Sequence, residues 1–308
     1  MKLSNRCTTF AILSTMSLST LAANVDIYGK ANVSVQSSDD GKGSYSEIKS
    51  NASRIGFKGN YALDNDLEVI FKAEFQVDID GDSEKGKSIT DRNQYLGLRG
   101  NFGEVLIGIN DTVLKQSQGK VDLFNDLNAD IKNLWKGENR LSDNITYKTP
   151  TMSGFQLGVT YIAEDSIDGE DAFSVAATFG DAKLKKSKIF ASIAMDSEVA
   201  GYDVKRGTVQ GKVAGFTLGL IVQTQEKIDG SAEMDGYMAS IKYVMNKITL
   251  KGQYQMADFK DSADKSGVSI GADYKLGETT KLYSFYTNFD IKDSPDKEYL
   301  GIGLEYKF

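Results

Sequence analysis

The chain has 308 residues, of which 43 are acidic and 36 are basic, so its formal net charge is −7. This balance argues against a nucleic-acid partner, which would call for a basic surface. The sequence has no histidine, and its one cysteine is Cys7. A Ser-His-Asp triad and histidine-ligated zinc are therefore excluded, and we expect no metal or other cofactor. Only a carboxylate pair could serve as an acid–base catalyst. No such pair stands out, so we expect no catalytic residues and no enzyme.

The first 23 residues have the pattern of a secretory signal peptide. Lys2 and Arg6 precede a short apolar run that ends in the small residues Ala22 and Ala23. Cleavage there would leave a single domain, residues 24–308, with a net charge of −9 and no thiol. No later apolar run approaches the roughly 20 residues that a membrane helix needs.

From Val25 onward, apolar and polar residues alternate with a period of two, which predicts β-strands. In residues 67–78, for example, Leu67 and Val69 share one face, and Glu68 and Glu74 share the other. The alternation recurs in residues 25–35, 155–161, 216–222, 237–243, 248–256 and 299–308. We count sixteen such segments, the least regular of which lie near residues 90–100, 183–195 and 279–290.

The connections between these segments alternate in length. Tight ones are expected at 60–66, 100–103, 150–154, 180–182, 214–215, 245–247 and 277–279, and longer, Asp-rich ones lie between them. This rhythm is typical of an up-and-down antiparallel barrel that spans a membrane with sixteen strands. The apolar faces would then contact lipid, and the last strand, which ends at Phe308, would pair with the first.

The polar faces would line a water-filled lumen. Lys30, Arg54, Lys58, Lys72 and Glu74 all occupy the polar phase of their strands, so we expect them to face this lumen. Arg92 lies in a strand whose phase is less regular.

Several segments resemble the general-diffusion porins of Gram-negative outer membranes. They are VDIYGK at 25–30, SRIGFKG at 53–59, YLGLRGNFGEVLIG at 95–108, NITYKTPTMSGFQLGVTY at 144–161 and the terminal Phe308. The resemblance implies a homotrimer in the outer membrane that contacts lipid and lipopolysaccharide and lets small hydrophilic solutes and ions diffuse passively. It also implies that the barrel assembly machinery reads Phe308.

The longest connection, residues 111–138, corresponds to the third loop of such porins. The resemblance implies that this loop folds into the lumen, where its carboxylates Asp122 and Asp126 face a basic wall. That wall would consist of Lys30, Arg54, Arg92 and Arg140. The chain departs from the family here, because Asn125, Leu127 and Asn128 stand where the family has a proline- and glycine-containing turn.

Two other functions stay open at this point. A substrate-specific outer-membrane channel would carry an aromatic ladder in its lumen, for which Phe124, Trp135, Tyr283 and Phe285 are candidates. A secreted carbohydrate-binding β-sandwich would also hide one face of each strand.

Overall fold

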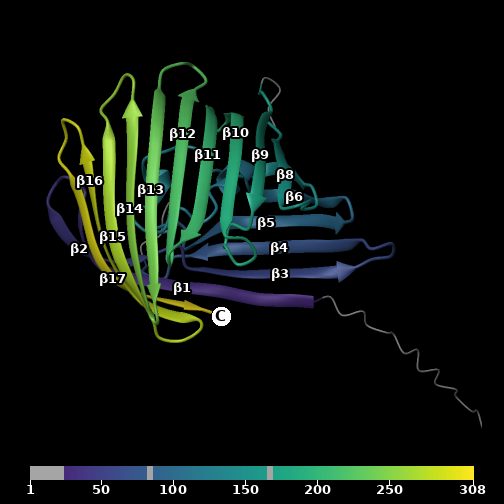
Figure 1. Cartoon of the computed structure of the whole chain (residues 1–308), viewed down its shortest axis with the longest axis horizontal. Coiled ribbons are helices and arrows are strands. Elements are labelled where there is room, and N and C mark those ends of the chain that lie inside the picture. Colours follow the sequence, from purple (N-terminus) through teal and green to yellow (C-terminus); the bar gives the residue numbers. More distant parts are fainter. Residues whose placement is uncertain (1–23, 82–85, 165–168) are drawn as a thin grey trace, which may run out of the picture.

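The computed structural model describes residues 24–81, 86–164 and 169–308, so the expected signal peptide lies outside the described residues. Figure 1 shows the strands following one another around a single curved sheet. In chain order the strands are β1 (Asn24–Asp39), β2 (Ser44–Ser50), β3 (Arg54–Ala62), β4 (Glu68–Val77), β5 (Ile89–Gly100), β6 (Gly103–Asp111), β7 (Arg140–Lys148), β8 (Phe155–Ile162), β9 (Ala172–Gly180), β10 (Ile189–Val199), β11 (Tyr202–Val213), β12 (Phe216–Lys227), β13 (Glu233–Met245), β14 (Ile248–Phe259), β15 (Lys265–Lys275), β16 (Thr280–Ile291) and β17 (Lys297–Lys307).

Two of these strands, β2 and β3, are the two halves of a single interrupted strand. β2 pairs with the second half of β1 and β3 pairs with its first half, and the break between them has Ala52 at a φ of 51°. Counted in this way, the described residues form a barrel of sixteen antiparallel strands.

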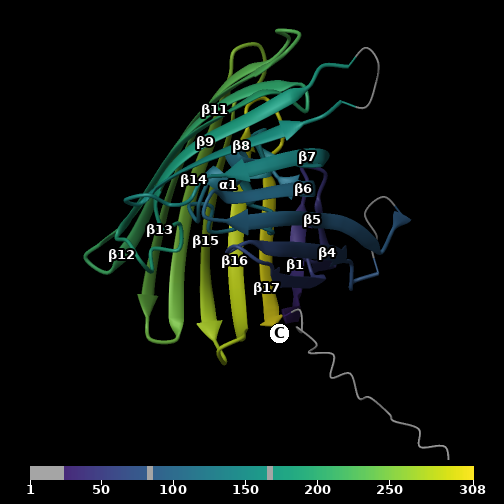
Figure 2. The same cartoon turned by 90° about the vertical axis from the view of Figure 1, so that its right-hand side faces the viewer.

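The barrel closes where β17 pairs with β1. Figure 2 shows the C-terminus beside the start of β1. Closure leaves no unpaired strand edge, as a sheet in hydrocarbon requires. The prediction of an all-β, sixteen-stranded antiparallel barrel is thereby confirmed, and the β-sandwich alternative is excluded.

Burial is inverted relative to a water-soluble sandwich. Along β12, Leu218, Leu220 and Val222 are exposed, whereas Gln223 and Gln225 are buried. The same exchange holds in β1, where Val35 is exposed and Gln36 is buried. An apolar outer face and a polar inner face are what a bilayer outside and water inside demand. No helix in the described part of the chain is long and apolar enough to cross a membrane.

One connection differs from expectation. The β9–β10 turn spans residues 181–188, instead of the expected 180–182, and β10 begins only at Ile189. The Asp181 carboxylate accepts hydrogen bonds from the backbone N–H groups of Lys183, Lys185 and Lys186, at 2.8 to 3.0 Å. These bonds hold the segment as a turn and keep it out of the sheet.

The segment between β6 and β7, residues 112–139, holds two short helices. They are α1 (Val113–Ser117) and the 3-10 helix η2 (Ile131–Asn133). The Thr112 side chain caps α1 by accepting the Lys115 N–H, and the Asp130 side chain caps η2 by accepting the Lys132 N–H. We call residues 112–139 the third loop.

Candidate functional site

The carboxylate of Asp126 joins the third loop to two basic side chains of the barrel wall. Its Oδ2 atom lies 2.7 Å from Lys30 Nζ and 2.6 Å from Arg54 Nη2. Lys30 in β1 and Arg54 in β3 are register partners, so the sheet itself places the two cations side by side. Burial alone would raise the pKa of Asp126, but Arg54 and Lys30 outweigh burial and lower it to about 2.

The wall network continues from Arg54 through Glu74. Glu74 Oε1 lies 2.7 Å from Arg92 Nε and 4.0 Å from Arg54 Nη1. Its Oε2 atom accepts a hydrogen bond from the Tyr28 hydroxyl at 2.7 Å and lies 3.3 Å from Lys72 Nζ. Two residues of the expected basic wall, Arg54 and Arg92, and the expected lumen-facing Lys72 thus meet at one carboxylate. Alternating charges of this kind hold each other in fixed positions.

Arg140 belongs to a separate group at the root of the third loop. Its Nε atom lies 3.0 Å from Asp111 Oδ1 and donates a hydrogen bond to Asn93 Oδ1 at 2.8 Å. Lys115 Nζ is also 3.0 Å from Asp111 Oδ1. Lys58, by contrast, is largely exposed and lies 3.8 Å from Asp26. Of the expected residues, it has the loosest connection to the network.

Asp122 is not in this network, which corrects the expectation that it faces the basic wall. Its side chain is buried beneath the loop and accepts hydrogen bonds from the N–H groups of Phe124 and Ile131 at 2.9 and 3.0 Å. Gln253 of β14 donates a third at 3.3 Å. Burial and the neighbouring negative charge of Asp130 raise the pKa of Asp122, while the three donors oppose this shift. Asp122 therefore fixes the loop's own conformation.

Glutamine side chains on the inner wall bind the backbone of the third loop. Gln253 accepts the Leu123 N–H at 2.8 Å, Gln225 accepts the Lys136 N–H at 2.8 Å, and Gln255 donates to the Ala129 carbonyl at 3.2 Å. Gln223 and Gln210 donate to the carbonyls of Lys136 and Lys120, both at 3.0 Å. These bonds replace the water that the loop backbone would otherwise need. They explain how the loop is held without the family's proline- and glycine-containing turn.

Apolar packing reinforces this attachment. The loop residues Val121, Phe124, Ile131 and Trp135 are buried in one cluster with side chains from the inner wall. The wall contributes Ile221, Met234, Met238, Ala257, Tyr283, Phe285, Phe289 and Tyr299. All four candidates for an aromatic ladder are in this cluster, so they are packed against one another and do not line an open path. The main sequence argument for a substrate-specific channel, an aromatic ladder in the lumen, is therefore not supported.

The fold and this site define a class of protein. It is a membrane-spanning β-barrel with a polar inner wall, to which a long loop is bound. Residues 8–294 match the family model described as Gram-negative porin. The chain belongs to this family.

Individual relatives are distant. The chain is 32% identical over 162 residues to the "Major outer membrane protein P.IB" of Neisseria sicca, a match that covers 48% of this chain but only 44% of that relative. Among solved structures, the anion-selective porin from Comamonas acidovorans has a TM-score of 0.75 at 17% identity and covers 93% of this chain and 100% of its own. The trimer form of in-vitro folded OmpT from Vibrio cholerae has a TM-score of 0.65 at 18% identity, covering 93% of this chain and 100% of its own.

Proposed function

We propose that the protein is a general-diffusion channel of the outer membrane, through which small hydrophilic solutes and ions pass passively. The observation that carries this proposal is the ion-paired contact of Asp126 with Lys30 and Arg54, which brings loop and wall charges together inside a closed polar barrel. Flux through such a path needs no conformational change, and selectivity comes from the width and charge of its narrowest part.

The third loop folds into the lumen and sets its narrowest cross-section in this proposal. Asp126 supplies the loop's charge, and Lys30, Arg54, Arg92 and Arg140 supply the basic wall. Lys58, Lys72 and Glu74 line the path nearby. Asp122 contributes indirectly, because it fixes the loop that carries Asp126.

The working unit is a homotrimer made from the mature domain, residues 24–308, after removal of residues 1–23. Support comes from the family and from the trimeric form of one structurally similar porin. The exposed apolar side chains of the outer wall contact lipid, and the long loops at one rim meet lipopolysaccharide. Phe308 carries the signal for the barrel assembly machinery. Short turns face the periplasm, as in other outer-membrane barrels.

Two measurements test the channel. Purified protein inserted into planar lipid bilayers should produce discrete conductance steps grouped in threes. Liposomes that contain it should swell at rates that fall smoothly with the size of the added sugar. Conductance steps that occur singly would contradict the proposed trimer. Liposomes that swell no faster than protein-free ones would contradict the proposed diffusion function.

A further inference from the structure

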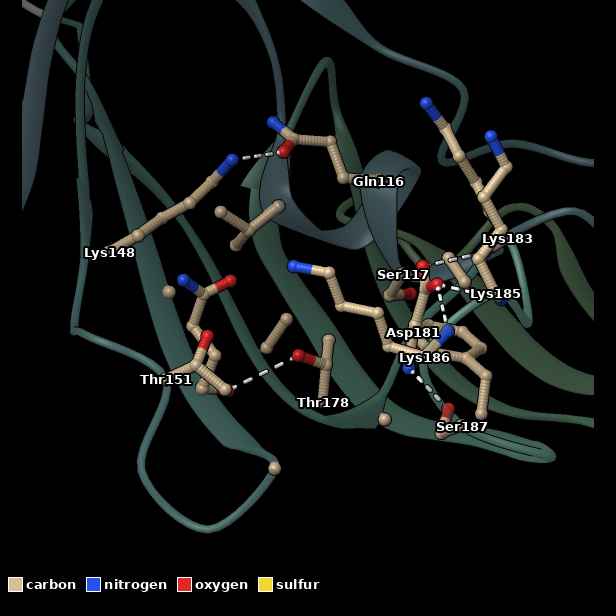
Figure 3. A pocket seen from close by; sticks show the side chains of 18 residues that line it. Gln116, Ser117, Lys148, Thr151, Thr178, Asp181, Lys183, Lys185, Lys186 and Ser187 are labelled. Carbon is tan, nitrogen blue, oxygen red and sulfur yellow. Dashed lines mark hydrogen bonds between the residues drawn. The ribbon is translucent and has the colours of Figure 1, made fainter.

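A cavity of about 730 Å³ lies between α1 and the inner faces of β8, β9 and β10, at the end of the barrel where the short turns lie. Its rim is basic. Figure 3 shows Lys183, Lys185 and Lys186 of the β9–β10 turn on one side of the cavity, with Lys148 and Gln116 across from them. The side chain of Lys186 extends from the turn toward the middle of the cavity.

Little negative charge balances these lysines. Asp181 is the single acidic residue among the described residues that line the cavity, and three backbone N–H groups of the turn already occupy it. None of Lys183, Lys185 and Lys186 has a carboxylate of a described residue within 4.0 Å. Lys148 is shared between Gln116, at 2.6 Å, and the more distant Glu104, at 3.7 Å.

The positive region extends into an adjoining cavity of about 300 Å³. Lys120, Lys212 and Lys242 line it together with Lys183 and Lys185, and no acidic residue is among its described lining residues. Burial lowers the pKa of the Lys120 amino group, and the positive charge of Lys183 lowers it further. Both cavities therefore hold unneutralised positive charge on the same side of the lumen.

The floor of the larger cavity is apolar, in contrast to its rim. Val113, Ala176 and Phe190 line it and are buried. Gly158 leaves room there, since a Cβ atom at this position would lie 3.0 Å from Val113 Cγ1. Thr178 and Gln156 supply neutral polar groups between floor and rim. Concave sites with apolar floors and a few convergent polar groups are typical of small-molecule binding.

We propose that this cavity is a binding site for small organic anions with an apolar body, such as aromatic carboxylates. The carboxylate would pair with the amino groups of the β9–β10 turn, and the ring would rest on Phe190 and Val113. The site would hold such solutes briefly as they pass the periplasmic mouth. This proposal rests on the proposed channel function.

Benzoate is the probe, with acetate as the matched anion that lacks a ring. Trimers in planar bilayers are first measured in potassium chloride alone, so that a failure of the channel itself is detected before any anion is added. Benzoate on the turn side should then cause a reversible, saturating loss of current. Acetate at the same concentrations should cause at least tenfold less. Equal effects of the two anions would overturn the site, because charge alone would explain them.

Two variants locate the site. K183Q/K185Q/K186Q should raise the half-blocking benzoate concentration at least tenfold. K247Q/K275Q/K307Q removes the same charge from other parts of the short-turn end and should change it less than twofold. T178W keeps all the lysines but fills the cavity, so benzoate block should be lost while chloride current persists. Unchanged block in the first variant or in T178W would overturn the proposal. Equilibrium dialysis of benzoate against purified trimers makes the same comparison without any current, should a variant conduct poorly.

Discussion

The terminal ring of Phe308 packs so closely over Gly29 that a Cβ atom on Gly29 would lie 2.3 Å from the ring Cζ. The two residues also exchange backbone hydrogen bonds, from the Gly29 N–H at 3.0 Å and from the Phe308 N–H at 3.2 Å. The alternating, apolar end of the chain is thus docked onto the first strand, and it completes the closure of the barrel.

Gly29→Ala should therefore destabilise the barrel. The added methyl group must displace the ring or the Arg54 carbonyl, which it would approach to 2.9 Å, and overpacking of this kind costs about 1 to 3 kcal/mol. The measurement is the temperature at which the folded band disappears in gel electrophoresis. Gly211→Ala is the control, because its nearest neighbour would be 3.6 Å away. In a Phe308→Ala background the cost should shrink. Equal melting of the two alanine variants would contradict this account.

Asp126→Asn should lower the preference for cations over anions. The carboxylate is the loop's contribution to the charge network, and its loss leaves Lys30 and Arg54 without their closest anion. A charge about 10 Å from a passing ion contributes about 0.4 kcal/mol in water and several-fold more in a confined lumen, so the permeability ratio should change about twofold or more. Reversal potentials in a salt gradient measure this ratio. Asp296→Asn, in an exposed outer loop, should leave it unchanged, and a similar shift in both variants would remove Asp126 from the ion path.

Gln253→Ala should loosen the third loop without opening the barrel. Gln253 binds the Leu123 N–H, the Asp122 carboxylate and the Ala129 carbonyl. In the variant Asp122 keeps the N–H donors of Phe124 and Ile131, and the Ala129 carbonyl keeps Gln255, but the Leu123 N–H loses its acceptor. A buried group left without a partner costs about 1 to 3 kcal/mol. Trp135 is the single tryptophan of the chain and is buried with its Nε1 donating to the Met256 carbonyl at 2.9 Å. Its fluorescence therefore reports directly on loop attachment. Acrylamide should quench it more strongly in the variant.

The control for this variant is Gln94→Ala, whose side chain makes one hydrogen bond to a described residue, to Asp91 at 2.7 Å. Quenching should stay at the wild-type level there. If Gln253→Ala also stays at that level, the glutamine contacts do not hold the loop.

The strands could be predicted from the sequence because each one faces lipid on one side and water on the other. Apolar and polar residues therefore alternate along each strand. The same rule placed Lys30 and Arg54 on one face, and the two are register partners in the sheet. Their contact with the third loop was implied by the family resemblance and not by the alternation. Asp122 was misplaced for a physical reason. Its environment depends on Gln253, 131 residues away, and no local pattern encodes that contact.

One signal of the loop's attachment was present in the sequence. Ile221, Met234 and Met238 are apolar residues on the otherwise polar inner phase, and they are among the wall positions that the loop covers. Such breaks in the alternation indicate where the inner wall is covered by protein and does not contact water. The β9–β10 turn escaped prediction because the lysine-rich residues 183–188 have no period of their own, and their conformation depends on the hydrogen bonds to Asp181.

Acid should release the charge contact of the third loop within a defined pH window. The pKa of Asp126 is lowered from 3.8 to about 2, so the folded protein binds fewer protons than a chain with the loop detached. The stabilisation is therefore fully present above pH 3.8 and is lost as the pH falls through about 2. Reversal potentials should stay constant from pH 7 to pH 4 and then move toward anion preference. Asp126→Asn should begin nearer that acid value and move less. A wild-type shift centred near pH 6 would show that another group controls selectivity.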